Sequence, residues 1–204
     1  MPAKNHDLHG NAPDSAAVAL LVIDMINDLE WEGGDALLPH ALRAAECIVG
    51  LKAAARRADV PVIYANDNFG RWRSDFREVV EHCLHDGVRG QPIAGLLAPD
   101  REDYFVLKPK HSAFFATTLD TLLTYLGVQR LIITGIAGDT CVTITAMDAF
   151  LRDYDLHVPA DCTASCDPAE NAKALAYMKR VLHADTSKAG DVDFRSLIER
   201  RVNA

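Results

Sequence analysis

AVALLVID, at residues 17–24, is the stretch of sequence that decides the fold. Every residue in it except the final aspartate is apolar, so a strand formed here carries apolar side chains on both of its faces. Strands of this kind lie in the middle of parallel sheets, where helices cover both faces. The stretch therefore predicts a central strand of an α/β protein, with Asp24 at its carboxyl end.

Short apolar runs of the same kind recur along the chain, separated by segments with a helical pattern. The further predicted strands are PVIYAND (61–67), YFVLK (104–108), LIITG (131–135), DLHVPAD (155–161) and a short sixth at HADTS, near His183. An Ala-rich amphipathic stretch over 39–57 and the segment TTLDTLLTYLGV are typical of the helices between them. The alternation predicts a three-layer α/β/α fold, Rossmann-like, with a central, mostly parallel, six-stranded sheet.

The organisation of the chain favours one domain. No internal repeat and no Pro/Gly/Ser-rich linker divides it, so we expect a single domain over residues 16–204. Residues 1–15 are polar and lack a hydrophobic signal core, and we interpret them as a mobile N-terminal arm. The longest strongly apolar run, Ala16 to Ile23, is too short to span a bilayer. We therefore expect a cytoplasmic protein without a membrane segment.

Composition excludes several classes of partner. The 204 residues include 21 Lys and Arg against 29 Asp and Glu, for a formal net charge of -8. With no basic run in the sequence, this balance disfavours binding to nucleic acid or to an acidic membrane surface.

The five cysteines are an odd number in a chain long enough to bury a core without disulfides. We therefore expect free thiols.

Three reactive side chains follow predicted strands, where parallel sheets bind their ligands. Asp24 and Lys108 end the first and third strands, and Cys141 follows the fourth after the turn GIAGDT. A helical segment begins at Cys141, and the positive end of a helix favours a thiolate. Asp24 could then accept the thiol proton while Lys108 balances the charge. The alternatives are a buried core cysteine and a structural ion pair at the sheet edge.

Three motifs, taken in order, resemble the isochorismatase-like cysteine hydrolases, the family that includes nicotinamidases, N-carbamoylsarcosine amidase and isochorismatase. They are DMINDL after the first strand, KPKHSAF after the third and GIAGDTCVTITAMDA after the fourth. The resemblance extends from Ala17 to about Thr186. It implies the isochorismatase-like hydrolase fold and assembly into a homo-oligomer, either a dimer or a tetramer.

The resemblance also implies a catalytic triad of Asp24, Lys108 and Cys141. In such enzymes the cysteine attacks an amide or related carbonyl, the aspartate acts as base and then as acid, and water releases the acyl-enzyme. A cis peptide between Ile136 and Ala137, and an oxyanion hole formed by the N–H groups of Ala137 and Cys141, are implied as well. We therefore expect a hydrolase that cleaves an amide-type C–N bond of a small molecule.

Two other functions stay open. True isochorismatases cleave a vinyl ether with the aspartate, so Asp24 could do this here with Cys141 incidental. The presence of Cys141 favours acyl chemistry over this alternative. The other alternative is a non-catalytic binding or scaffold protein that keeps the fold, which the intact set of Asp24, Lys108 and Cys141 disfavours.

The sequence departs from nicotinamidases after the second strand. Those enzymes carry an aspartate and histidines there that bind a metal ion, whereas the corresponding stretch ANDNFGRWRSDF contains Asp67 and no histidine. A single carboxylate does not make a transition-metal site. We therefore predict no metal and no cofactor, and nicotinamide is a less favoured substrate.

Six further residues near the strand ends are candidates for substrate binding. They are Trp31, Asn68, Phe69, Trp72, His111 and Phe114. The loop NFGRWRSDF, which contains three of them, either lines the pocket or makes a subunit contact. The alternative for Trp31 and Phe114 is core packing, and His111 is either a proton donor near the substrate or a solvated bystander.

Overall fold

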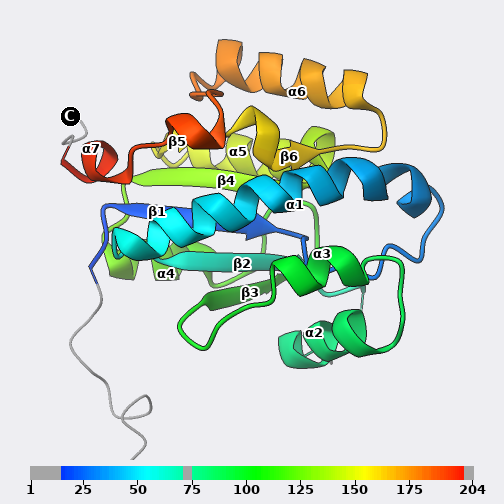
Figure 1. Ribbon diagram of the computed structural model, residues 1–204. Helices are drawn as coiled ribbons and strands as arrows, with labels where there is room; N and C mark the ends of the chain where they lie inside the picture. Colours follow the sequence, from blue (N-terminus) through cyan, green and yellow to red (C-terminus); the bar gives the residue numbers. More distant parts are fainter. Residues whose placement is uncertain (1–14, 71–74, 200–204) are drawn as a thin grey trace, which may run out of the picture.

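The computed structural model describes residues 15–70 and 75–199. Over these residues the chain forms one central sheet with helices on both sides of it (Figure 1). The predicted N-terminal arm lies outside the described residues apart from Ser15, and so does Trp72.

Six parallel strands make up the sheet. They are β1 (Val18–Ile23), β2 (Val62–Asp67), β3 (Tyr104–Lys108), β4 (Arg130–Ile136), β5 (Asp155–His157) and β6 (Thr163–Ala164). Their order is β3-β2-β1-β4-β5, and β6 also pairs with β4. All residues of β1 are fully buried between β2 and β4, as its apolar sequence requires. The predicted three-layer α/β/α fold is therefore confirmed.

The sixth strand does not lie where the sequence predicted it. The HADTS run forms only a bridge between His157 and Asp185, whereas the sixth strand is Thr163–Ala164. The predicted fifth strand was also too long, because β5 stops at His157. Pro159 has no N–H to donate to a neighbouring strand, and the chain instead makes a short 3-10 turn before it rejoins the sheet beside β4.

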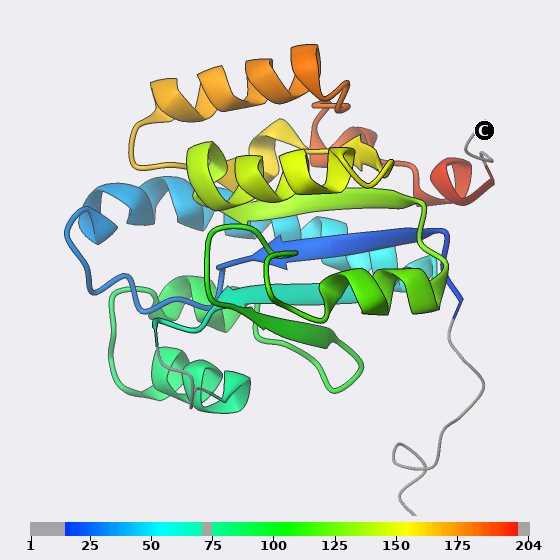
Figure 2. The same ribbon diagram turned by 180° about the vertical axis from the view of Figure 1, so that it is seen from behind.

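The helices divide between the two faces of the sheet (Figures 1 and 2). On one face lie α1 (Gly34–Arg57), α2 (Phe76–His85), α3 (Gln91–Leu96) and α7 (Phe194–Glu199). On the other lie α4 (Leu119–Leu126), α5 (Thr143–Phe150) and α6 (Pro168–Val181). Successive residues of β1 enter the two cores in turn, because side chains alternate along a strand. No helix within the described ranges combines the length and the apolar character that crossing a membrane requires.

The strand order reverses direction beside β1. The chain passes from β1 to β2 and β3 on one side, and then returns to β4 on the other side of β1. At such a reversal the loops after neighbouring strands run in opposite directions and leave room for a ligand. Asp24 follows β1 and Cys141 follows β4, so both lie at this point of the sheet.

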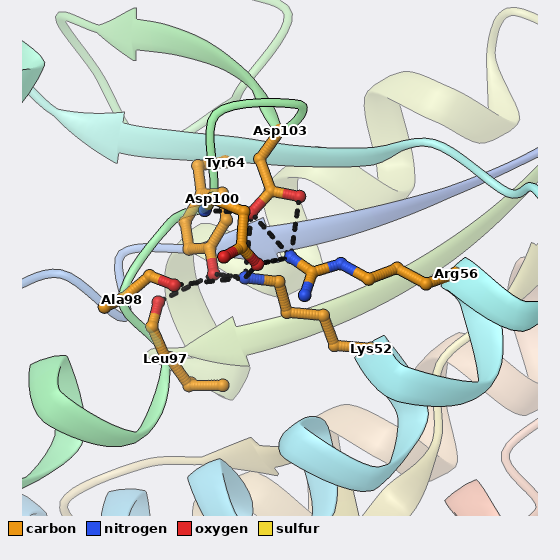
Figure 3. A network of polar contacts seen from close by, with 7 residues as sticks. All are labelled: Lys52, Arg56, Tyr64, Leu97, Ala98, Asp100 and Asp103. Atoms are coloured by element: carbon orange, nitrogen blue, oxygen red, sulfur yellow. Dashed lines mark hydrogen bonds and ion pairs between the residues drawn. The ribbon is translucent and has the colours of Figure 1, made fainter.

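A buried ion cluster ties α1 to the residues that enter β3 (Figure 3). Lys52 Nζ lies 2.8 Å from a carboxylate oxygen of Asp103 and donates a hydrogen bond of 2.8 Å to the Tyr64 hydroxyl. Arg56, which is more exposed, pairs with the same carboxylate at 3.2 Å. Burial lowers the pKa of Lys52, and the hydrogen bond to Asp103 opposes this change. The cluster therefore holds the start of β3, whose last residue is Lys108.

Candidate active site

Three strand ends bring one lysine and two aspartates together. Lys108 Nζ lies 2.8 Å from Asp24 Oδ2 and 3.6 Å from Asp67 Oδ2. Lys108 faces the same side of the sheet as Val106, toward α4 and α5, because the two residues are two positions apart on β3. Its side chain is completely buried and reaches past β2 to the end of β1. The ion pair thus joins two strands that are not neighbours.

The charges around Lys108 keep it protonated. Burial by itself lowers the pKa of Lys108, but its interactions with Asp24, Cys141 and Asp67 outweigh this effect, and the pKa lies above its usual 10.5. The ammonium also donates to the backbone oxygen of Lys110 at 3.3 Å. Lys108 is therefore a buried, charged donor that contacts Asp24, Asp67 and Cys141.

Asp24 is held by contacts to both of its carboxylate oxygens. Oδ2 pairs with Lys108, and Oδ1 accepts a hydrogen bond of 2.7 Å from the backbone N–H of Asp67. Its φ of 53° lies in the left-handed region, which aspartate tolerates better than most residues. Burial raises the pKa of Asp24 above its usual 3.8, and the charge of Lys108 opposes the rise.

The Cys141 thiol lies beside this pair. Its Sγ is 3.5 Å from Lys108 Nζ and 3.6 Å from His111 Nδ1, and a hydrogen bond links it to Asp24. Burial and then the charge of Asp24 raise the pKa of Cys141 to about 12, although Lys108 lowers it. Burial and the charge of Asp24 therefore oppose the thiolate that the sequence predicted at this helix N-terminus.

Close packing shapes the turn before Cys141. The peptide bond between Ile136 and Ala137 is cis, and residues Gly138–Val142 form one wide helical turn that leads into α5. A Cβ at Gly138 would overlap the amide oxygen of the Asn171 side chain, which would then have to move. The hydroxyl of Thr143 donates to the Gly138 carbonyl at 2.6 Å. The turn therefore holds the thiol in one place.

The loop that contains His111 is fastened to α5, the helix that follows the thiol. The Ser112 hydroxyl donates to the Asp148 carboxylate, and the Ala113 N–H donates to the Thr145 hydroxyl at 3.0 Å. Both acceptors lie on α5. The chain directly after His111 is therefore tied to the helix that follows the thiol.

The structure distributes the other candidate binding residues over several environments. Asn68 is buried, and its backbone N–H donates to the Lys108 carbonyl at 3.0 Å, so it borders the group. Phe69 is half exposed on the same loop. Trp31 lies before α1, beside Gly33 and also half exposed. Phe114 is buried in the core on the α4 and α5 face.

Sequence reasoning missed the contacts of Asp67 with Lys108 and of Ser112 with Asp148. The place of Asp67 at the end of a strand was a usable signal for the first contact. The second joins residues 36 positions apart, and no local pattern indicates it.

The metal site of nicotinamidases does not fit these residues. The stretch ANDNFGRWRSDF contains Asp67 and no histidine, and the Lys108 ammonium lies 3.6 Å from the Asp67 carboxylate, where it would repel a cation. Within residues 15–70 and 75–199, no group of three or more His, Cys, Asp or Glu side chains is arranged to hold a metal ion.

Fold and site together define a class of protein: a parallel α/β protein that holds a thiol beside a buried Asp–Lys pair at the carboxyl edge of its sheet. The isochorismatase domain model matches residues 18–189. The chain therefore belongs to the isochorismatase family, which is a family of hydrolases.

Relatives cover most of the chain. The uncharacterized isochorismatase family protein YaaI of Bacillus subtilis is 44% identical over 167 residues, which are 82% of this chain and 91% of YaaI. A probable inactive nicotinamidase of Arabidopsis thaliana is 31% identical over 180 residues, 80% of this chain and 88% of that protein. Ureidoacrylate amidohydrolase RutB of Yersinia enterocolitica is 30% identical over 188 residues, 80% of this chain and 82% of RutB.

A solved structure has the same fold. The crystal structure of N-carbamoylsarcosine amidase from Thermoplasma acidophilum superposes with a TM-score of 0.66 at 26% identity. The match covers 86% of this chain and 98% of that one.

Proposed function

We propose that the protein is a cysteine hydrolase that cleaves an amide-type C–N bond of a small molecule. Cys141 is the nucleophile, Asp24 is the base, and Lys108 holds both in place. One observation carries the proposal: a single buried ammonium lies 2.8 Å from the Asp24 carboxylate and 3.5 Å from the Cys141 sulfur. The names of two relatives, a ureidoacrylate amidohydrolase and an N-carbamoylsarcosine amidase, support this type of bond.

Proton transfer accompanies the attack of the sulfur. The thiol is protonated at rest, since its pKa is about 12, and its hydrogen bond to Asp24 gives the proton a path. The proton passes to the Asp24 carboxylate as Sγ bonds to the carbonyl carbon. The backbone N–H groups of Ala137 and Cys141 then stabilise the oxyanion, a contribution of about 3 kcal/mol per donor in other enzymes. Asp24 then gives this proton to the departing nitrogen as the C–N bond breaks, and water hydrolyses the acyl-enzyme that remains.

An activity screen with matched variants tests the nucleophile. Primary amides, carbamoyl compounds, ureido compounds and isochorismate are offered to the wild type, Cys141→Ala and Cys166→Ala, the last a control at an exposed thiol. We expect amide hydrolysis by the wild type and the control, and a loss of about 10³-fold or more in Cys141→Ala. Mass spectrometry after treatment with an acylating probe should find the adduct on Cys141. Acylation elsewhere, or an active Cys141→Ala, would contradict the proposal.

One observation favours a second function. Burial raises the pKa of Asp24, and a protonated carboxyl group can protonate a vinyl ether. Turnover of isochorismate that persists in Cys141→Ala and disappears in Asp24→Asn would identify this chemistry. If no compound is turned over and Cys141 is not acylated, the protein is instead a binding or scaffold member of the family.

The remaining parts of the proposal concern partners and location. We propose a small-molecule substrate, no nucleic-acid or membrane partner, no metal or cofactor, a cytoplasmic location and assembly into a dimer or tetramer. Sedimentation velocity at micromolar concentration tests the assembly, which a monomer would contradict.

A further inference from the structure

A buried hydroxyl ties the turn that contains Cys141 to the end of β6. The backbone N–H of Asp139 donates to Ser165 Oγ at 3.1 Å, and the Ser165 hydroxyl donates back to Asp139 Oδ1 at 2.8 Å. Ser165 directly follows β6 and is buried. The two hydrogen bonds therefore hold both the backbone and the side chain of Asp139, two residues before the thiol.

Asn171 of α6 supports the same turn from another element. Its Oδ1 lies 3.2 Å from Ser165 Oγ, and it covers Gly138 so closely that a Cβ there would overlap it. Its Nδ2 donates to the Thr163 hydroxyl at 3.3 Å. Thr163 pairs with Gly135 of β4. Ser165 therefore lies in a network that joins the turn to α6, to β6 and to the strand that leads into the turn.

The sulfur and the backbone of the turn are held by different contacts. The sulfur of Cys141 lies 3.5 Å from Lys108 Nζ and 3.6 Å from His111 Nδ1. The backbone is held at Asp139, which lies in the chain between Ala137 and Cys141. The N–H groups of those two residues are the oxyanion donors of the proposed function. Such donors stabilise a transition state only when they already point at the oxygen on which charge develops.

We propose that Ser165 is a positioning residue, which orients the N–H groups of Ala137 and Cys141 toward the oxyanion by fixing Asp139 between them. This inference rests on the proposed function. A displacement of about 1 Å can lower a rate about 10²-fold. Loss of the hydroxyl should therefore slow a reaction of Cys141 that forms an oxyanion and spare one that forms none.

The test compares two such reactions in Ser165→Ala. Acylation by 4-nitrophenyl acetate passes through an oxyanion, and stopped-flow release of nitrophenolate measures its rate. Methyl methanethiosulfonate instead transfers its methylthio group to the sulfur as the thiol proton and methanesulfinate leave, and no oxyanion forms on carbon. We expect acylation to slow about 10²-fold. Methylthiolation of Cys141, followed by mass spectrometry, should keep its wild-type rate.

Two variants of Asp139 show whether the hydrogen bonds are the cause. Asp139→Ala removes the acceptor of the Ser165 hydroxyl but keeps the backbone N–H, so acylation should slow less than in Ser165→Ala. Asp139→Asn keeps an oxygen that can accept this hydrogen bond, and it should restore most of the wild-type rate. Both variants should fold, because Asp139 is exposed.

Thr134→Val is the matched control for the loss of a buried hydroxyl. The Thr134 hydroxyl donates to the Leu21 carbonyl at 2.8 Å inside the sheet. Its loss should lower stability and leave both rates of Cys141 unchanged. Urea denaturation shows that each variant is folded under the conditions of the assay.

Two results would overturn the assignment of Ser165. One is an unchanged acylation rate in Ser165→Ala. The other is an equal loss of acylation and methylthiolation, which would mean that the hydroxyl acts on the sulfur or on the fold as a whole. Failure of the proposed function looks different, since Cys141 of the wild type is then not acylated at all.

Discussion

Lys108 reaches Asp24 across the end of an intervening strand, and this requires a long side chain. β1 and β3 are separated by β2, so their axes lie about 9.5 Å apart. The ammonium bridges that gap while Asp67, at the end of β2, lies 3.6 Å from it. Removing one partner of a buried ion pair leaves the other charge without compensation. Substitutions at Asp24 or Lys108 should therefore lower stability as well as activity.

The pH dependence of acylation follows from the raised pKa of Asp24. Asp24 accepts the thiol proton only as a carboxylate, and its pKa lies above 3.8. The acylation rate with a 4-nitrophenyl ester of the acid that the substrate yields should therefore rise with pH through an apparent pKa above 3.8, which belongs to the coupled Asp24–Cys141 pair. Lys108, with a pKa above 10.5, stays protonated over this range. Stopped-flow release of nitrophenolate measures the profile. A rate that does not change with pH would contradict the mechanism.

Gly135, just before the cis peptide, should tolerate no side chain. Its φ is 119°, and a Cβ there would overlap the backbone of Ile23 on the neighbouring strand. We expect Gly135→Ala to lower the free energy of unfolding by about 3 kcal/mol or more. Gly95→Ala is the control, because its Cβ would meet nothing within 4 Å in α3 and should be neutral or slightly stabilising. Urea denaturation measures both, and similar values for the two variants would refute the explanation.

At the scale of elements, β3 is an edge strand that buried charges hold at both ends. Asp103, just before it, pairs with Lys52 of α1, and Lys108, its last residue, pairs with Asp24, which follows β1. Between these ends Phe105 is half exposed, so apolar packing holds the strand only in part. The Lys52 cluster therefore contributes to the position of Lys108 in the candidate active site.

Breaking this cluster should destabilise the protein. Lys52→Met leaves the buried Asp103 carboxylate with Arg56 as its partner, and we expect a loss of about 3 kcal/mol in the free energy of unfolding. The double variant Lys52→Met with Asp103→Leu should lose less, since no charge is left buried. Arg56→Met, at the exposed end, should cost about 1 kcal/mol or less. A double variant less stable than Lys52→Met would contradict this account.

At the scale of the whole molecule, the two apolar cores share one sheet. One core lies under α1 and the other under α4 and α5, and alternate residues of β1 belong to each. Neither core can lose its packing without disturbing the sheet. We therefore predict a single unfolding transition, with coincident midpoints by far-UV circular dichroism and tryptophan fluorescence. Two separated transitions would contradict a single domain.

The sequence predicted the architecture because periodicity is a local property. The fully apolar run of β1 and the alternation of strands and helices were enough to indicate a parallel three-layer fold. The sixth strand was misplaced because Thr163–Ala164 is too short to have a pattern and pairs only where the chain returns to β4.

By itself the sequence also determined which residues end the strands, and a parallel sheet brings those ends to one edge. On that ground the sequence predicted that three reactive side chains meet at this edge: Asp24, Lys108 and Cys141. Only the tertiary structure decided that His111 touches the thiol and that the pKa of Cys141 is raised. These properties depend on burial and on distances between groups far apart in the chain, which the packing of whole elements sets and no local pattern contains.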